Sequence, residues 1–421
     1  MSAIVKAGKK LKNLIKASGI FKTEHRVTYV RRIERIRTDK RICAMTFDDG
    51  PMALPASPDG FGGRGLTDVL LDTLKKHNAR ATFDIVGCTA ENYPDKPGKL
   101  GSAAWGGEKF DHYPDIDADT WGGAVNCGDT VCRMLDEGHE LANHGYRHII
   151  FGKKPFVYGK REHFKSIDEV TNDLSKLHDY IKDNFGYEIK LSRPPHYVDR
   201  IDKCFTSYDA YALMGYGYMA ASYDGGGWLP SGLPEADAAT KDEIDAMISV
   251  IEKRLCEDPD FFCGQIIFGK DGYNMAKRTP VAYALDKQLE LLCKYGYTVV
   301  PVSELMEESP FADVGRECDL LPELIELSQR RAIAYSDNTL RLENKMTNYE
   351  YAMLVCPREA AVEQRIDRIK KSGKYISEYD TALAYAKEMG YLDKNARGKD
   401  LYRGLTRYEV LKEYVSRKTR A

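Results

Sequence analysis

Two adjacent carboxylates form the first group of residues whose types and spacing suit chemistry. Asp48 and Asp49 follow an apolar run at 42–45 and precede a Gly-Pro pair, which predicts a buried strand that ends in both carboxylates. Neighbouring side chains on an extended backbone point in opposite directions, so one carboxylate can hold a cation while the other handles a proton. Taken alone, this turn is equally typical of an ordinary strand-to-turn junction.

Two histidines form the second group. His144 and His148 are four residues apart in the stretch 138–148. Two imidazoles at that spacing can converge on one metal ion. The histidine pair therefore strengthens the interpretation of the carboxylate pair as part of a functional site.

The two motifs together resemble the polysaccharide deacetylases of the NodB-homology type, carbohydrate esterase family 4, over about residues 41–305. Residues 46–51 read Thr-Phe-Asp-Asp-Gly-Pro, and residues 143–148 match the family's pattern of Asn-His, three residues and His. The resemblance implies that Asp48 is the catalytic base and that Asp49, His144 and His148 are metal ligands. Neither motif is specific alone, whereas the combination is.

A third stretch, 193–197, reads Arg-Pro-Pro-His-Tyr. The resemblance implies that Arg193 holds Asp48 in its ionised form, and a neighbouring guanidinium does lower the pKa of a carboxylate. It also implies a backbone N–H for the oxyanion, which His196 or Tyr197 can supply because a backbone donor is indifferent to its side chain. Pro195, His196 and Tyr197 are therefore expected in the substrate groove.

Two positions depart from the family pattern. The family's Asp-x-x-Asp-Trp motif aligns with 224–228, where Gly227 replaces the second Asp and Trp228 remains as a groove wall. Lys270 stands where the family has its general-acid histidine. General acid catalysis is typically worth ~10²–10⁴ in rate, so its loss predicts a slow enzyme. Lys270 is either a substitute proton donor or one half of a salt bridge, with Asp224 or Asp271 as candidate partners.

Composition describes an ordinary soluble protein. The 421 residues carry 30% charged residues and a formal net charge of -2, which gives no global field for a nucleic-acid partner. The ten cysteines are scattered, and only Cys127 and Cys132 lie close enough in sequence to suggest a bridge. We expect most of them to be buried small hydrophobic residues.

The first 40 residues contain 12 Lys or Arg against 3 Asp or Glu, with apolar residues near one face of a possible helix. Such a segment can lie on an anionic membrane surface, and a solvated arm that leads into a strand at 27–36 is equally consistent. No apolar stretch is long enough for a signal-peptide core or a membrane span.

From residue 41 the sequence alternates between strand-like and helix-like runs, which predicts a parallel sheet with chemistry at its carboxyl edge. The resemblance implies the same α/β fold, a distorted (β/α)7 barrel over 41–308. Residues 88–126 form a long insertion, either an aromatic carbohydrate platform or a loop folded around its own side chains. The predicted strands are 42–49, 81–87, 218–223, 265–268 and 297–302, and the predicted helices are 66–77, 129–137, 167–184, 244–255 and 281–295.

Residues 310–421 predict a smaller helical domain. Two segments, around 311–352 and 379–411, each lead through a loop to a Thr-x-Tyr-Glu helix start, which is also an ordinary capping box. They resemble two degenerate S-layer-homology repeats, with Asn348 where the repeat has Arg. The resemblance implies contact with a cell-wall polymer, while a plain packing domain is an equal alternative.

The sequence thus predicts a metal-dependent hydrolase that removes N-acetyl groups from an amino-sugar polysaccharide, either peptidoglycan or a chitin-like polymer. The nitrogen-rich ligand set favours one zinc ion. The alternative is a catalytically impaired barrel that binds carbohydrate or acts as a cell-wall scaffold. The family resemblance implies the cell envelope or the extracellular space, and a cytoplasmic location is an alternative because no signal peptide is found.

Overall fold

A computed structural model describes residues 26–58, 60–91, 121–153, 162–227, 238–272 and 278–418. Within these residues, nine strands form one parallel sheet in the order β1-β6-β5-β4-β3-β2-β8-β7, with β9 beside β2. The α/β fold predicted from the sequence is therefore confirmed. The strands are β1 (Arg32–Ile33), β2 (Ile42–Asp48), β3 (Thr82–Ile85), β4 (Glu140–Asn143), β5 (Leu191–Ser192), β6 (Gly217–Met219), β7 (Tyr223–Asp224), β8 (Ile266–Lys270) and β9 (Thr298–Val300).

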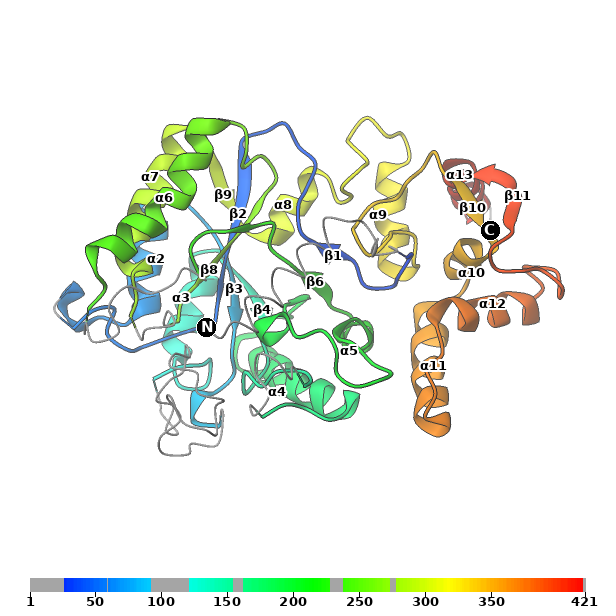
Figure 1. Cartoon of the computed structure of the whole chain (residues 1–421), viewed down its shortest axis with the longest axis horizontal. Helices are drawn as coiled ribbons and strands as arrows, with labels where there is room; N and C mark the ends of the chain where they lie inside the picture. Colours follow the sequence, from blue (N-terminus) through cyan, green and yellow to red (C-terminus); the bar gives the residue numbers. More distant parts are fainter. Residues whose placement is uncertain are drawn as a thin grey trace, which may run out of the picture.

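Helices pack around this sheet, and the five helices that were predicted form close to their predicted positions (Figure 1). The helices at 207–214 and 302–308 were not predicted. Their buried faces carry Leu, Ile and Val at helical spacing, as in α2, where Leu70, Leu71 and Leu74 are fully buried. The helices of this domain are α2 (Leu66–Lys76), α3 (Gly128–Asp136), α4 (Ile167–Phe185), α5 (Ser207–Met214), α6 (Lys241–Glu257), α7 (Val281–Lys294) and α8 (Val302–Glu308).

The predicted strand at 218–223 is in fact two strands. Tyr218 of β6 pairs with Arg32 of β1, whereas Tyr223 of β7 pairs with Ile267 of β8. These two strands lie near opposite ends of the sheet order and yet only three residues separate them. The sheet must therefore curl until its ends approach each other, which is the geometry of a distorted barrel.

The sheet begins before residue 41, the predicted start of the barrel. β1 lies within the basic N-terminal region and pairs with β6. Ile36 then donates its backbone N–H to the Gly264 carbonyl at 2.8 Å, beside the entry to β8. The segment 32–36 thus spans the gap between the two ends of the curled sheet. Residues 1–25, where the amphipathic helix was predicted, lie outside the described residues.

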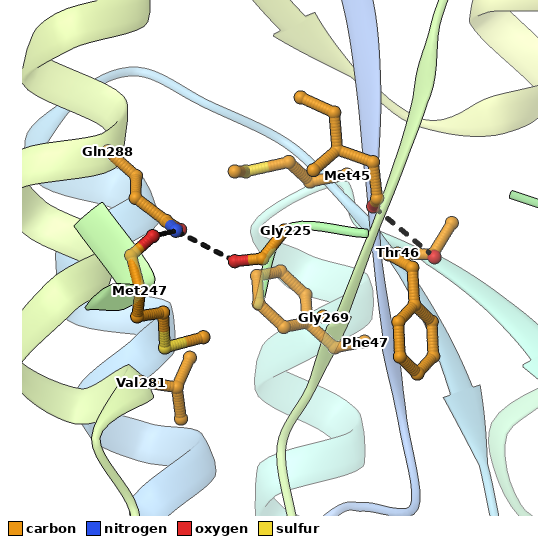
Figure 2. Close-up of a pocket in the computed structure, with 10 residues that line it drawn as sticks. Met45, Thr46, Phe47, Gly225, Met247, Gly269, Val281 and Gln288 are labelled. Atoms are coloured by element: carbon orange, nitrogen blue, oxygen red, sulfur yellow. Dashed lines mark hydrogen bonds between the residues drawn. The ribbon is translucent and has the colours of Figure 1, made fainter. Parts of the chain in front are cut away.

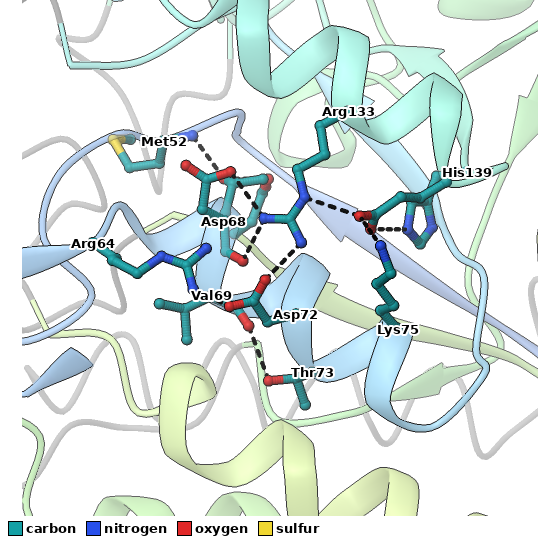
Figure 3. A network of polar contacts seen from close by, with 12 residues as sticks. Met52, Arg64, Asp68, Val69, Asp72, Thr73, Lys75, Arg133 and His139 are labelled. Carbon is teal, nitrogen blue, oxygen red and sulfur yellow. Dashed lines mark hydrogen bonds and ion pairs between the residues drawn. The ribbon is translucent and has the colours of Figure 1, made fainter. Parts of the chain in front are cut away.

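An ion-pair network on the outer surface joins α2 to α3 (Figure 3). Arg133 of α3 binds Asp68 and Asp72 of α2, and its Nε lies 3.0 Å from Glu137. Such partly exposed pairs contribute little singly, but the shared guanidinium fixes one helix against the other. Nearby His139 is buried, and its Nδ1 accepts the Ala81 N–H at 3.0 Å. His139 therefore has a structural role.

The C-terminal region folds around its own core and lies beside the barrel (Figure 1). It is mainly helical, as predicted, and adds a short antiparallel sheet, β10 (Lys345–Thr347) with β11 (Leu401–Thr406), which was not predicted. A buried ion pair between Arg365 and Asp209 of α5 joins it to the barrel. Its helices are α9 (Leu321–Arg330), α10 (Asn348–Val355), α11 (Arg358–Ser372), α12 (Glu378–Glu388) and α13 (Arg407–Lys418).

The two repeat-like segments have the same local structure. Each has a strand that leads into a capped helix: the Thr347 N–H donates to the Glu350 side chain, and the Thr406 N–H donates to the Glu409 side chain. The strands of the two segments pair with each other. Arg407, the arginine of the second motif, is buried, and its Nε donates to the Leu340 carbonyl at 2.6 Å. Its described contacts are therefore internal to the domain.

The ten cysteines are all free thiols, including Cys127 and Cys132. Among the described helices, none combines the length and apolar character needed to cross a bilayer.

Candidate active site

The chemically relevant side chains gather at the carboxyl ends of neighbouring parallel strands. β2 ends at Asp48, which lies in register with Asp84 of β3 on one side and Lys270 of β8 on the other. β4 ends at Asn143, directly before His144. Parallel strands bring such positions to one edge of the sheet, so residues far apart in sequence become neighbours.

The three residues predicted as metal ligands, Asp49, His144 and His148, form a buried cluster. Oδ1 of Asp49 lies 3.1 Å from Nε2 of His148 and 3.3 Å from Nε2 of His144. The two imidazole rings have their centroids 5.0 Å apart. Asp49 has a φ of 87° and His148 a φ of 52°, which are left-handed values that non-glycine residues rarely adopt. Such backbone strain is common at functional sites.

A network of hydrogen bonds holds the turn between the two histidines. The Asn143 side chain accepts the Gly145 N–H at 2.9 Å and donates to the Leu174 carbonyl of α4. Asp173 of α4 accepts the Tyr146 N–H at 2.8 Å. The turn is thus fixed from two sides, which explains how a loop can hold two imidazoles on one point.

Arg193 binds Asp48, the predicted base. A guanidinium nitrogen of Arg193 donates to Oδ1 of Asp48, and two of its nitrogens donate to the Thr46 hydroxyl at 3.1 Å. Burial raises the pKa of Asp48 to about 7, and this outweighs the lowering by Arg193. Arg193 is itself fully buried and sits between the rings of Tyr197 and Phe268, at 5.5 and 5.4 Å.

Arg193 also contacts the metal-ligand cluster through its backbone. Nδ1 of His144 donates to the Arg193 carbonyl at 2.8 Å, which leaves Nε2 to face Asp49. A hydrogen bond at one ring nitrogen selects the tautomer that presents the other to a metal. One residue therefore orients both the predicted base and a predicted ligand.

Asp84 is a site residue that the sequence analysis missed. It is fully buried in β3, and its Oδ2 lies 2.8 Å from Nδ1 of His144. Burial opposes charge on the His144 ring, but Asp84 and Asp48 outweigh burial, so the pKa of His144 lies well above its usual range. His148 differs, because burial lowers its pKa to about 4. The available signal for Asp84 was an aspartate between the apolar residues Phe83 and Ile85 of a predicted strand.

Asp271 is a second residue without a predicted catalytic-site role. Its N–H donates to the Asp48 carbonyl at 3.1 Å, and its Oδ2 accepts from the Thr67 hydroxyl at 3.1 Å. Burial raises the pKa of Asp271 to about 8. A Cβ on Gly50 would lie 1.9 Å from Oδ2 of Asp271, so the motif needs glycine at this position. Asp271 therefore supports the turn that follows Asp49.

Lys270 lies inside the site. Its ammonium is 3.0 Å from Oδ2 of Asp49, and only 8% of its side chain is exposed. The sequence analysis considered Asp224 and Asp271 as partners for a salt bridge, whereas this ion pair is with the predicted metal ligand. The reason is register, because Lys270 lies opposite Asp48 at the ends of adjacent strands.

Gly227, the second departure, is packed against an aromatic ring. A Cβ at this position would lie 2.4 Å from the ring of Phe268. A side chain of α7 fixes the loop 225–227: the Gln288 amide donates to the carbonyls of Gly225 and Met247 at 2.8 and 2.7 Å (Figure 2). Trp228, predicted as a groove wall, lies outside the described residues, as do Trp105 and Tyr113 of the insertion.

The predicted substrate residues Pro195, His196 and Tyr197 form a short 3-10 turn beside the histidines. The rings of His196 and His148 have their centroids 5.3 Å apart. The Tyr197 N–H donates to the Pro194 carbonyl at 2.9 Å and is therefore used within the turn.

The cluster fits a divalent cation. Ligand atoms of Asp49, His144 and His148 all lie within 4.8 Å of one another, and all three residues are buried. One carboxylate and two imidazoles form a donor set that zinc accepts, with further positions left for small ligands. The ion pair of Asp49 with Lys270 engages Oδ2, so Oδ1 is the oxygen that faces both imidazoles.

Comparison with known proteins points in the same direction. Residues 35–203 match the family model described as polysaccharide deacetylase. The chain is 27% identical over 187 residues to the peptidoglycan-N-acetylmuramic acid deacetylase PdaC of Bacillus subtilis, which covers 44% of this chain and 27% of that protein. It is also 27% identical over 167 residues to the peptidoglycan-N-acetylglucosamine deacetylase PgdA of Listeria monocytogenes. This alignment covers 40% of this chain and 24% of that protein.

The chain thus spans about a quarter of the length of these two curated relatives. A solved structure of PdaC from Bacillus subtilis is 23% identical in sequence, with a TM-score of 0.39, over 65% of this chain and 93% of that one. The matched region, 35–203, contains the strand ends that carry Asp48, Asp49, His144, His148 and Arg193. Residues 35–203 of the chain are therefore similar to polysaccharide deacetylases.

Proposed function

We propose that the protein hydrolyses N-acetyl groups of an amino-sugar polysaccharide, with acetate as one product. The observation that carries this proposal is the convergence of Asp49, His144 and His148 on one point, with Asp48 beside them and Arg193 bound to it. The names of PdaC and PgdA support peptidoglycan as the substrate. This substrate also supports a location in the cell envelope.

Asp49, His144 and His148 would hold one divalent cation, and their donor set favours zinc. When bound, such an ion polarises a carbonyl group and makes water more acidic. Asp48 accepts the proton of the attacking water on Oδ2, because Arg193 occupies Oδ1. The Arg193 guanidinium keeps this carboxylate in one orientation. The His196 backbone N–H stabilises the oxyanion that develops on the acetyl group.

Hydrolysis of the amide is completed when a proton reaches the leaving amine. Lys270 is the proposed donor, because its ammonium lies at the same strand edge, 3.0 Å from Asp49. The alternative is that the chain lacks a general acid and works slowly, since one such group is worth ~10²–10⁴ in rate. Turnover of Lys270→Ala separates the two: a strong decrease supports the donor role, and an unchanged turnover contradicts it.

The rival function is a catalytically impaired barrel that binds glycan without hydrolysing it. The packing of Phe268 against Gly227 favours this rival, because it occupies the space that an aspartate at 227 would need.

Binding of the C-terminal domain to a cell-wall polymer is a further part of the proposal, supported by the two similar strand-and-helix segments.

The test is an acetate-release assay of the metal-loaded protein on peptidoglycan and on N-acetylglucosamine oligomers. Release by the native protein, and its loss in His148→Ala together with loss of the metal, would support the proposal. Glycan binding without acetate release on any of these substrates would favour the scaffold. Full metal content in a His144→Ala/His148→Ala double variant would contradict the metal site.

A further inference from the structure

Lys270 and Asp49 form an ion pair in the interior of the site. The ammonium of Lys270 lies 3.0 Å from Oδ2 of Asp49, with 8% of the lysine side chain and 2% of the aspartate side chain exposed. Charges removed from water this completely interact far more strongly than surface charges do. The pair is therefore a strong interaction that involves one of the three proposed metal ligands.

The two oxygens of Asp49 face different groups. Oδ1 lies 3.1 Å from His148 and 3.3 Å from His144, so a cation held by the three ligands would bind this oxygen. Oδ2 faces Lys270. A metal ion and an ammonium would then share a single carboxylate, and two positive charges at this separation repel each other.

We propose that Lys270 is an internal competitor for the metal ion at Asp49. This inference rests on the metal site of the proposed function and adds a control of its affinity. Without metal, the ammonium neutralises the buried Asp49 carboxylate. With metal, the ion pair must weaken or the lysine side chain must move. Removal of the positive charge should therefore tighten metal binding, whereas loss of a supporting contact would weaken it.

The position of Lys270 supports this role. It ends β8 directly opposite Asp48, and the next residue, Asp271, donates its N–H to the Asp48 carbonyl. The backbone of Lys270 is thus fixed beside the two motif carboxylates.

The experiment is a zinc titration of the full chain, with a chelator of known affinity as competitor. Lys270→Met keeps a long side chain and removes the charge. Lys241→Met is the matched control, because Lys241 is 85% exposed on α6 and pairs with Asp245 away from the site. We expect the zinc Kd of Lys270→Met to fall at least about tenfold below that of the native protein. This is the scale on which groups around metal ligands change metal affinity. The zinc Kd of the Lys241→Met control should not change.

An equal or weaker zinc affinity of Lys270→Met would overturn the competitor role and leave the proposed metal site standing. If none of the three proteins binds zinc, both the metal site and the competitor role fail. Lys270→Gln provides a second uncharged variant if Lys270→Met does not fold. In that variant, saturating zinc should raise the melting temperature more than in the native protein, since tighter binding stabilises the native state more.

Discussion

Asp84 lies 2.8 Å from Nδ1 of His144 and is fully buried in β3. The Arg193 carbonyl contacts the same ring nitrogen at 2.8 Å. A carboxylate at this distance raises the basicity of the imidazole and so makes Nε2 a stronger metal ligand. Asp84 is thus a positioning residue for the proposed metal site, although it does not face the metal position itself.

Asp84→Asn should therefore weaken zinc binding about 10–100-fold, because the amide keeps the shape of the side chain and removes its charge. The measurement is a zinc titration of the purified variant. Asp224→Asn is the control, because Asp224 is an exposed carboxylate at the end of β7. Equal zinc affinity of Asp84→Asn and the native protein would contradict this role.

Asp48→Asn should keep the metal and lower acetate release by about 10²–10⁴-fold, since an amide cannot accept the proton of the attacking water. Metal content and turnover should be measured on the same preparation. Asp49→Asn is the matched control and should lose metal together with activity. Turnover that survives in Asp48→Asn would show that another group is the base.

Restoring the family's Asp and His with Gly227→Asp and Lys270→His should not raise turnover. The new Cβ at 227 would lie 2.4 Å from the Phe268 ring, which itself packs against Arg193. Overpacking of this kind typically costs about 1–3 kcal/mol. We expect a lower melting temperature for the double variant than for Lys270→His alone. A faster double variant with a native melting temperature would contradict this packing argument.

Gly50→Ala should destabilise the protein by about 1–3 kcal/mol, because its Cβ would overlap the buried Asp271 carboxyl. Urea unfolding measures the change. Gly128→Ala is the control, since a Cβ there meets only an ordinary contact with Phe185 at 3.8 Å. In the Gly50→Ala/Asp271→Ala double variant, the combined loss should be smaller than the sum of the single losses. Simple additivity would show that the two positions do not collide.

The buried ring of His139 should make stability sensitive to acid. Burial lowers the pKa of His139 to about 4, below the usual value of 6.5, so the unfolded state binds the proton more readily. The contribution of the neutral His139 ring to the free energy of unfolding is complete above about pH 6.5 and is lost as the pH falls towards 4. Urea unfolding of His139→Gln between pH 4 and 7.5 should show a shallower acid slope than the native protein. An unchanged slope would exclude His139 as the cause.

The local features of this protein follow from its sequence. The apolar run before Asp48 predicts β2, the helical spacing of leucines predicts α2, and the residues at 46–51 and 143–148 identify the candidate base and ligands. These features depend on short-range periodicity and residue type, which a sequence displays directly. The parallel arrangement follows as well, because alternating strands and helices permit few other folds.

Only the tertiary structure decided which groups meet across the strand ends. Register between β3 and β4 brings Asp84 to His144, and register between β2 and β8 brings Lys270 to Asp49, although these pairs are 60 or more positions apart in the chain. The same is true of Phe268, whose ring occupies the space beside Gly227. Side-chain neighbours across a sheet depend on strand order and curl, and a pattern within a single strand does not contain either of them.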